Sequence, residues 1–266
     1  THIRVELQKF VRLIHGVVPD IATTGFADLV AQDGKGGVRL MFMNRSRDYW
    51  DANGDGISEL VKWNSQTASL DAFYRTGKSG RLKARAWFTK EFRRGGSQFD
   101  LEPHQTDVTE QLDHRIFGGE LAWETLFKDP RHRFSAYVSM QGVFRDSYYG
   151  GGGRVLQPGD SLTEADLLAI NAYGKSEDLS LVGGAQYSGP LAKALELIAG
   201  AEFQRNRVKD RMPGYQRQID QEVQVLGSYA QLEWKPLRGF SLVGGARFDY
   251  VRILGSYRFG QNLGLV

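Results

Sequence analysis

The clearest chemical spacing in this chain lies in a short acidic segment. Oxygen-bearing side chains recur at alternate positions, with a glycine sixth and a backbone carbonyl seventh, as at the start of a calcium-binding loop. The candidate ligands are Asp51, Asn53, Asp55, Ile57 (through its carbonyl) and Glu59. Lys62 stands at the twelfth position, where such loops carry a bidentate glutamate. The segment therefore predicts either a calcium site without its usual closing ligand or a solvated acidic turn.

No other group of residues has the spacing of a metal or catalytic centre. The five histidines are scattered without a pair at metal-ligand spacing, and the chain has no cysteine. No Gly-x-Ser-x-Gly segment supplies a hydrolase nucleophile. We therefore predict that the protein is not an enzyme and requires no cofactor, with calcium at 51–59 as the one candidate ion.

The elements that position these residues show a period of two. Between Gly227 and Lys235 small and apolar residues alternate with polar ones, and the alternation restarts after the turn 236–239. Further hairpins with the same pattern cover 67–89, 117–141 and 179–203. Long polar segments separate them at 44–64, 94–113, 147–174 and 205–221. Short turns on one rim and long loops on the other predict an all-β fold, an antiparallel transmembrane β-barrel.

The composition indicates a single domain over residues 1–266 and excludes several classes of protein. A net charge of only +3 gives no support to nucleic-acid binding. No run of about 18 apolar residues predicts a transmembrane helix, and the first residues do not form a signal peptide. Aromatic residues near strand ends suit the girdles of a barrel, or the core of a soluble sandwich. They include Trp50, Trp63, Trp123, Phe127, Trp234 and Phe240.

Six segments carry a resemblance to a known family: 47–60, 91–96, 145–150, 172–175, 227–237 and 244–250. Together they resemble TonB-dependent outer-membrane receptors of the cobalamin and siderophore uptake type. The resemblance implies a plug domain inside a 22-stranded barrel in the outer membrane of a Gram-negative bacterium. We recognise about ten to twelve strands and no plug-like segment, and we therefore assign the chain to the barrel portion.

The resemblance also implies a function and partners. The receptor would take up a scarce nutrient complex, such as siderophore-bound iron or a cobalamin-like molecule, through a gated barrel. Its partners would be that small molecule, the TonB energy-transducing complex and outer-membrane lipid, with a surface lipoprotein or other subunits as further candidates. The ligand contacts expected in the loops are Trp50, Trp63, Arg93, Arg94, Tyr148, Tyr149 and Tyr173. Of these, Tyr148 and Tyr149 are expected to be exposed anchors.

Basic side chains fall on the polar face of the predicted strands. They are Arg81, Lys83, Arg85, Arg93, Arg133, Arg145 and Arg247. In a receptor they could hold a plug or attract an anionic ferric siderophore, whereas in a simple pore they would favour anions. The sequence alone does not separate these alternatives.

The alternation also fits two other classes of protein, and two segments interrupt it. A small passive outer-membrane porin would share the alternation, and so would a soluble carbohydrate-binding β-protein whose apolar face is a buried core. The hairpin rhythm breaks over 15–37, and 249–259 lacks the long loop expected there. Both breaks would result if segments of a larger barrel were missing at those places.

Overall fold

The computed structural model describes residues 2–14, 18–260 and 262–265. Its strands are β1 (His2–Ile14), β2 (Val18–Val30), β3 (Gly36–Arg47), β4 (Lys62–Thr76), β5 (Gly80–Gly96), β6 (Val108–Leu126), β7 (Arg133–Gly151), β8 (Tyr173–Ala192), β9 (Leu195–Met212), β10 (Arg217–Leu237), β11 (Phe240–Phe259) and β12 (Asn262–Leu265). Three short helices lie in connections between strands: η1 (Pro103–Gln105), α1 (Glu164–Asn171) and η2 (Pro213–Tyr215).

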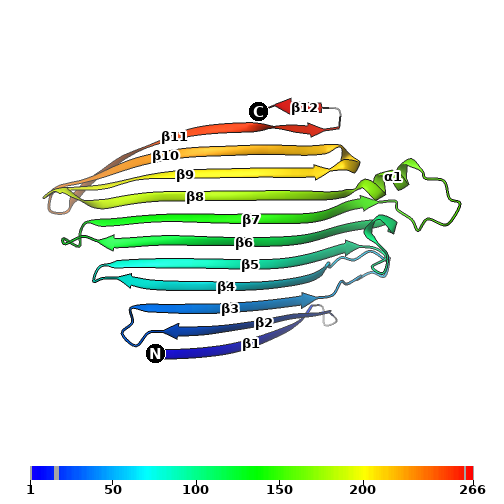
Figure 1. Cartoon of the computed structure of the whole chain (residues 1–266), viewed down its shortest axis with the longest axis horizontal. Coiled ribbons are helices and arrows are strands. Elements are labelled where there is room, and N and C mark those ends of the chain that lie inside the picture. The colour runs from blue at the N-terminus through cyan, green and yellow to red at the C-terminus, as the bar shows by residue number, and fades with distance from the viewer. Residues whose placement is uncertain (1, 15–17, 261, 266) are drawn as a thin grey trace.

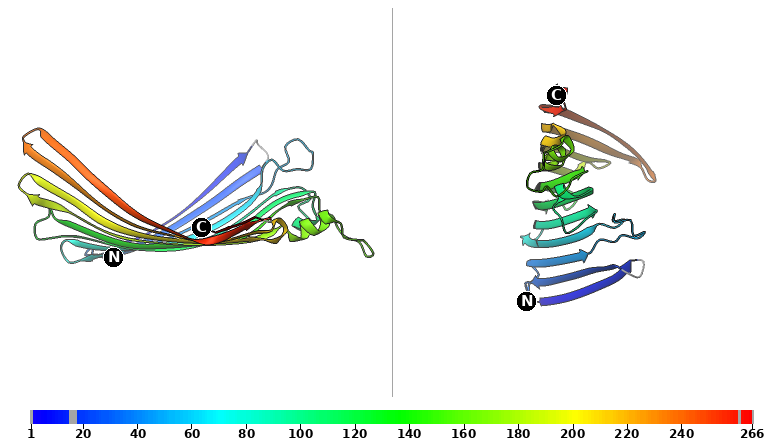
Figure 2. Two further views of the ribbon diagram at one scale, coloured as in Figure 1. Left: turned by 90° about the horizontal axis from the view of Figure 1, so that it is seen from above. Right: turned by 90° about the vertical axis from the view of Figure 1, so that its right-hand side faces the viewer.

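All the strands belong to one sheet in which neighbours along the chain are neighbours in space. The order runs from β1 to β12 without a crossover, and each strand pairs antiparallel to the next. The sheet is strongly curved and open, with β1 at one edge and β11 and β12 at the other (Figures 1 and 2). The short turns lie at one end of the strands and the long connections at the other (Figure 1). The all-β antiparallel prediction is confirmed.

One face of the sheet is apolar and has no covering layer among the described residues. Leu40, Leu70 and Ala86 stand directly opposite one another on β3, β4 and β5, and all project from this face. Leu40 is 53% exposed, Leu121 52% and Leu226 53%. A soluble sandwich would bury such residues, because each costs free energy when it faces water. We call this the outer face and the opposite, polar face the inner face.

A polar boundary limits the apolar band on the side of the long loops. On each of the first eleven strands one outward position ends the continuous apolar run, although Val11 and Leu13 on β1, Ile21 on β2 and Leu254 on β11 face outward beyond it. The positions that end the run are Lys9, Thr23, Asn44, Gln66, Lys90, Arg115, Asp146, Glu177, Arg205, Gln224 and Arg252. Below this boundary the band extends for roughly ten residues per strand, which corresponds to a height of about 25 Å at the usual tilt of barrel strands.

The strands are longer than their alternation predicts, because they continue past the polar boundary. The segment 205–221, predicted as a loop, is mostly paired strand, and only 213–216 connects β9 to β10. Above the boundary both faces meet water, so the alternation disappears although the backbone pairing persists. A cross-strand ion pair replaces apolar contact there, with Arg205 Nη2 at 2.7 Å from Glu222 Oε2. The other three predicted loops are shorter than expected for the same reason.

The two segments that interrupt the alternation contain regular strands. β2 pairs with β3 from Asp20 to Val30, although residues 15–17 lie outside the described part of the chain. β11 runs without interruption and pairs with β10 through Arg258. The segment 249–259 is thus continuous strand, in keeping with the absence of a long loop from its sequence. Val251, Ile253 and Leu254 place apolar residues on both faces, and this obscures the alternation.

The aromatic girdle is confirmed on the side of the short turns only. Trp123, Phe127, Trp234 and Phe240 are exposed by 39% to 54% near these turns. Trp63, predicted to belong to a girdle, instead lies among arginines of the inner face. No helix in the described part of the chain is long and apolar enough to span a membrane.

Candidate functional site

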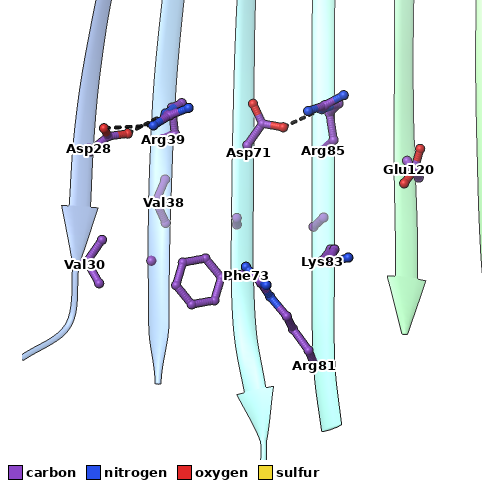
Figure 3. A pocket seen from close by; sticks show the side chains of 13 residues that line it. Asp28, Val30, Val38, Arg39, Asp71, Phe73, Arg81, Lys83, Arg85 and Glu120 are labelled. Atoms are coloured by element: carbon purple, nitrogen blue, oxygen red, sulfur yellow. Dashed lines mark hydrogen bonds and ion pairs between the residues drawn. The ribbon is translucent and has the colours of Figure 1, made fainter. Parts of the chain in front are cut away.

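A row of alternating charges crosses the inner face of the sheet. Asp28, Arg39, Asp71, Arg85 and Glu120 stand directly opposite one another on β2 to β6 (Figure 3). Both oxygens of Asp28 accept hydrogen bonds from Arg39, at 2.6 Å from Nε and 3.1 Å from Nη2. Asp71 accepts a hydrogen bond from Arg85 Nε. Because the residues are in register, each cation lies between two carboxylate-bearing strands. We call these five residues the charge ladder.

A hollow of about 510 Å³ lies over the charge ladder toward the short turns. The Arg81 guanidinium lies 4.7 Å from the centre of the Phe73 ring, and both line the hollow (Figure 3). Lys83 Nζ reaches Glu124 Oε1 at 2.7 Å. Side-chain exposures of 57% for Arg39 and 60% for Arg85 leave the donors of the ladder accessible. This wall can form hydrogen bonds and ion pairs with a polar molecule inside the barrel.

A second cluster on the inner face surrounds Trp63 near the long loops. The guanidinium carbons of Arg45, Arg93 and Arg47 lie 4.2, 5.1 and 5.6 Å from its ring centre. Trp63 Nε1 donates a hydrogen bond to Glu91 at 3.0 Å. An aromatic face among three guanidinium groups is stabilised by cation–π attraction, and it concentrates positive charge. We call Trp63, Arg45, Arg47 and Arg93 the tryptophan–arginine cluster.

The three arginines of this cluster differ in their anionic partners. Arg45 makes two hydrogen bonds to Asp20, which is only 6% exposed, with Nε at 2.8 Å. Arg93 Nε lies 2.9 Å from Glu91 Oε1. Arg47 donates instead to the Val61 carbonyl, at 3.2 and 3.3 Å. Two carboxylates therefore face three cations, and Arg47 retains a charge that a bound anion could neutralise.

Of the predicted ligand contacts, the structure places Trp63 and Arg93 together in this cluster. Arg94, next in sequence, points elsewhere and donates to the Leu101 carbonyl at 2.6 Å, which fastens the connection 97–107. Trp50 forms an isolated bridge with Leu60 across the connection 48–61. Sequence reasoning missed Arg45 and Arg47 because their proximity depends on cross-strand register. The available signal was a basic residue in the same phase on successive strands.

The expectation that Tyr148 is an exposed anchor is wrong. Its side chain is 1% exposed and packs edge to face against Tyr173, with ring centres 4.8 Å apart. Tyr173 receives a further contact from His104 Nδ1, 3.0 Å from its hydroxyl. Tyr149 is half-buried, and its carbonyl accepts a hydrogen bond from Tyr215. These tyrosines belong to a small core beneath α1 and η2. The strands extend beyond the polar boundary, and the two helices pack on this extension.

The acidic segment 51–59 forms a tight loop that gathers its carboxylates. Oxygen atoms of Asp51, Asp55 and Glu59 lie within 4.8 Å of one another. Gly54 and Gly56 adopt positive φ angles of 76° and 86°, and both donate backbone hydrogen bonds to Asp51 at 2.7 Å. These side chains are hard oxygen donors of the kind that calcium prefers. Calcium binding in this loop stays a prediction.

Ion pairs within the long connection 152–172 link Arg154 to Asp160 and Asp166. Arg154 Nε lies 3.0 Å from Asp166 Oδ1, and Asp166 is 3% exposed. Asp166 also closes the capping box of α1, in which Thr163 is the N-cap. The Arg154 guanidinium and the Thr163 hydrogen bonds hold the pKa of Asp166 well below its usual range.

In the turn 127–132, hydrogen bonds from Arg131 lower the pKa of Asp129 to about 2.

Comparison with solved structures identifies the architecture. No protein-family model and no curated protein sequence matches the chain. Its fold is similar to the siderophore receptor PiuA from Acinetobacter baumannii, with a TM-score of 0.50, 6% identity and coverage of 95% of this chain and 47% of the receptor. It is also similar to the open form of the ferric-catecholate import receptor Fiu from E. coli K12, with a TM-score of 0.50, 8% identity and coverage of 96% and 57%. The chain thus spans about half the length of each receptor.

The chain is a partial outer-membrane β-barrel. The apolar outer face, the polar boundary and the turn-side girdle are the features of a barrel wall in lipid. The similarity to the two receptors concerns fold, since the sequence identities are too low to carry an activity. The predicted outer-membrane location and antiparallel barrel architecture are confirmed, and the siderophore receptors PiuA and Fiu share that architecture.

Proposed function

We propose that this barrel wall belongs to a TonB-dependent receptor that takes up an anionic nutrient complex, of the ferric siderophore kind. The protein would act as a gated transporter and not as an enzyme. The observation that carries the proposal is the tryptophan–arginine cluster, which places one more cation than carboxylate beside an aromatic face on the inner wall. An aromatic ring among guanidinium groups suits a ligand that is both planar and anionic, as a metal-bound catecholate is.

The charge ladder supports the gated mechanism. Its exposed arginines and carboxylates alternate across five strands, so they offer both donors and acceptors to a polypeptide surface within the barrel. A removable plug needs contacts of this kind, because exposed ion pairs contribute little each and exchange readily with water. In this proposal the loops capture the complex, the cluster receives it, and energy from the inner membrane releases the plug.

A binding measurement on the full protein tests the proposal. The probe is a ferric tricatecholate complex, and its affinity is followed by quenching of tryptophan fluorescence. Replacing both Arg47 and Arg93 with glutamine should weaken binding by at least about ten-fold, because each charged hydrogen bond contributes about 1.5 kcal/mol or more. The matched control is Arg115→Gln, an outer-face arginine that pairs with Asp146. Equal affinity in the double variant and the wild type would contradict the proposed ligand site.

Transport is tested separately in cells. Uptake of radiolabelled iron from the same complex should stop when the proton gradient is dissipated. Uptake that continues without the gradient, together with ion conductance in a planar bilayer, would favour the passive porin. The two assays separate ligand binding from energy coupling, so each part of the proposal can fail alone.

A further inference from the structure

The five short turns carry a basic charge that the long connections do not share. These turns, 31–35, 77–79, 127–132, 193–194 and 238–239, hold six lysines and arginines against two aspartates. The connections 48–61, 97–107 and 152–172 hold one arginine against ten aspartates and glutamates. The two groups lie at opposite ends of the strands (Figure 1). We call the end formed by the five turns the turn rim.

Four cations of the turn rim lack a carboxylate partner. Lys78, Lys128, Lys193 and Arg238 occupy four successive turns and are exposed, and none forms an ion pair within the described part of the chain. The other two rim cations are paired inside their own turns. Lys35 Nζ lies 3.2 Å from Asp33, and Arg131 Nη2 lies 2.6 Å from Asp129. The four unpaired charges remain available to an external anion.

Exposed apolar side chains flank these cations. Phe127 (51% exposed) precedes Lys128, and Leu237 (72%) and Phe240 (54%) stand on either side of Arg238. Around the last turn, Lys235, Arg238, Leu237 and Phe240 line one hollow of about 500 Å³. A soluble anion would gain nothing from the apolar neighbours. A cation beside an apolar surface matches the boundary between phosphate groups and acyl chains in a bilayer.

We propose that the turn rim binds the phosphate groups of anionic phospholipids in the leaflet that faces the periplasm. Short barrel turns face that side of the outer membrane. A cation at a membrane surface favours an anionic over a neutral lipid by about five-fold (about 1 kcal/mol). The acidic long connections would repel the same lipids, so the charge difference between the two ends also favours one orientation in the membrane. This inference depends on the membrane location and is independent of the proposed transport.

Fluorescence quenching by brominated lipids tests the proposal. The full protein is reconstituted in phosphatidylcholine vesicles that contain either brominated phosphatidylglycerol or brominated phosphatidylcholine. Trp123 and Trp234, exposed near the turn rim, report the lipids that contact it. The wild type should prefer phosphatidylglycerol by about three- to five-fold, and high salt should reduce this preference. Replacing all four unpaired cations with glutamine should bring the ratio of the two association constants to about one.

Two control variants make the result specific. Glutamine replacements at Lys90, Lys175, Lys209 and Arg211, which project outward at or beyond the polar boundary, should keep the wild-type preference. Exchanging lysine for arginine at Lys78, Lys128 and Lys193 should keep it too, which separates lost charge from altered turns. The proposal is overturned if the wild type shows no preference, if the four-glutamine rim variant retains it, or if the boundary control loses it equally.

Discussion

Introducing an arginine at the middle of the outer face, by a substitution, tests whether that face meets lipid. Leu121 on β6 projects outward and lies about midway between Arg115, at the polar boundary, and Lys128, in the turn 127–132. At about 3.3 Å per residue and a tilt near 40°, it lies roughly 15 Å from each of them. Leu121→Arg therefore places a charge near the centre of the hydrocarbon layer. We expect a cost of about 2–4 kcal/mol relative to Leu121→Ala, or roughly a 30- to 700-fold smaller folding equilibrium constant.

The assay is reversible unfolding of the protein in phospholipid vesicles by guanidinium, followed by tryptophan fluorescence. The matched control is Ser139→Arg on β7, which faces inward directly opposite Glu120. An arginine there meets water and a carboxylate, so its effect should stay within about 0.5 kcal/mol. A third variant, Phe117→Arg, lies next to the polar boundary and should cost about 0–1 kcal/mol relative to Phe117→Ala. Equal costs at Leu121 and Ser139 would refute the assignment of the two faces.

Three further predictions concern the long connections. Terbium luminescence sensitised by Trp50 should report a cation bound at 51–59. The luminescence should be lost in the double variant with Asp51→Asn and Asp55→Asn, and it should be kept in Asp48→Asn. Equal luminescence in the wild type and both variants would exclude the site. Thr163→Ala removes the N-cap of α1 and should lower the local free energy of opening by about 1 kcal/mol. Hydrogen exchange of the amides over 164–171 measures this change. Unchanged exchange rates would show that the cap does not limit opening. The pKa of Asp166 is lowered in the folded protein, so its contribution to stability is complete above the ordinary aspartate pKa of about 4 and is lost as the pH falls through the lowered value. Protease cleavage of 152–172 should therefore increase only in strong acid. The variant Asp166→Asn should be cleaved readily at neutral pH.

The sequence predicts the membrane-embedded part of the fold well, because lipid on one side imposes a strict period of two. The turn-side hairpins follow from this pattern, as the pairs Leu70–Ala86 and Ala230–Ala246 show. Beyond the polar boundary the constraint ends, and strands such as β9 and β10 continue with ion pairs in place of apolar contacts. Their extension, and the burial of Tyr148 beneath α1, depend on tertiary packing that has no local periodic signal.

The candidate site was predictable in kind but not in detail. A basic inner wall follows from the phase of Arg81, Lys83 and Arg85 within one strand. The partners of those charges follow only from register across strands, which places Asp71 beside Arg85 and Arg47 near Trp63. A one-residue shift in pairing would move each of these side chains to the other face.

The most direct test of the account is a spin-label accessibility scan along β10 in lipid vesicles. Labels would be placed singly at each position from Leu226 to Trp234. Positions 226, 228, 230, 232 and 234 should be accessible to oxygen dissolved in lipid, and the positions between them should not. Alternation with a period of two, in this phase, would support a strand in the wall of an outer-membrane barrel. Uniform access to a water-soluble reagent at all nine positions would contradict it.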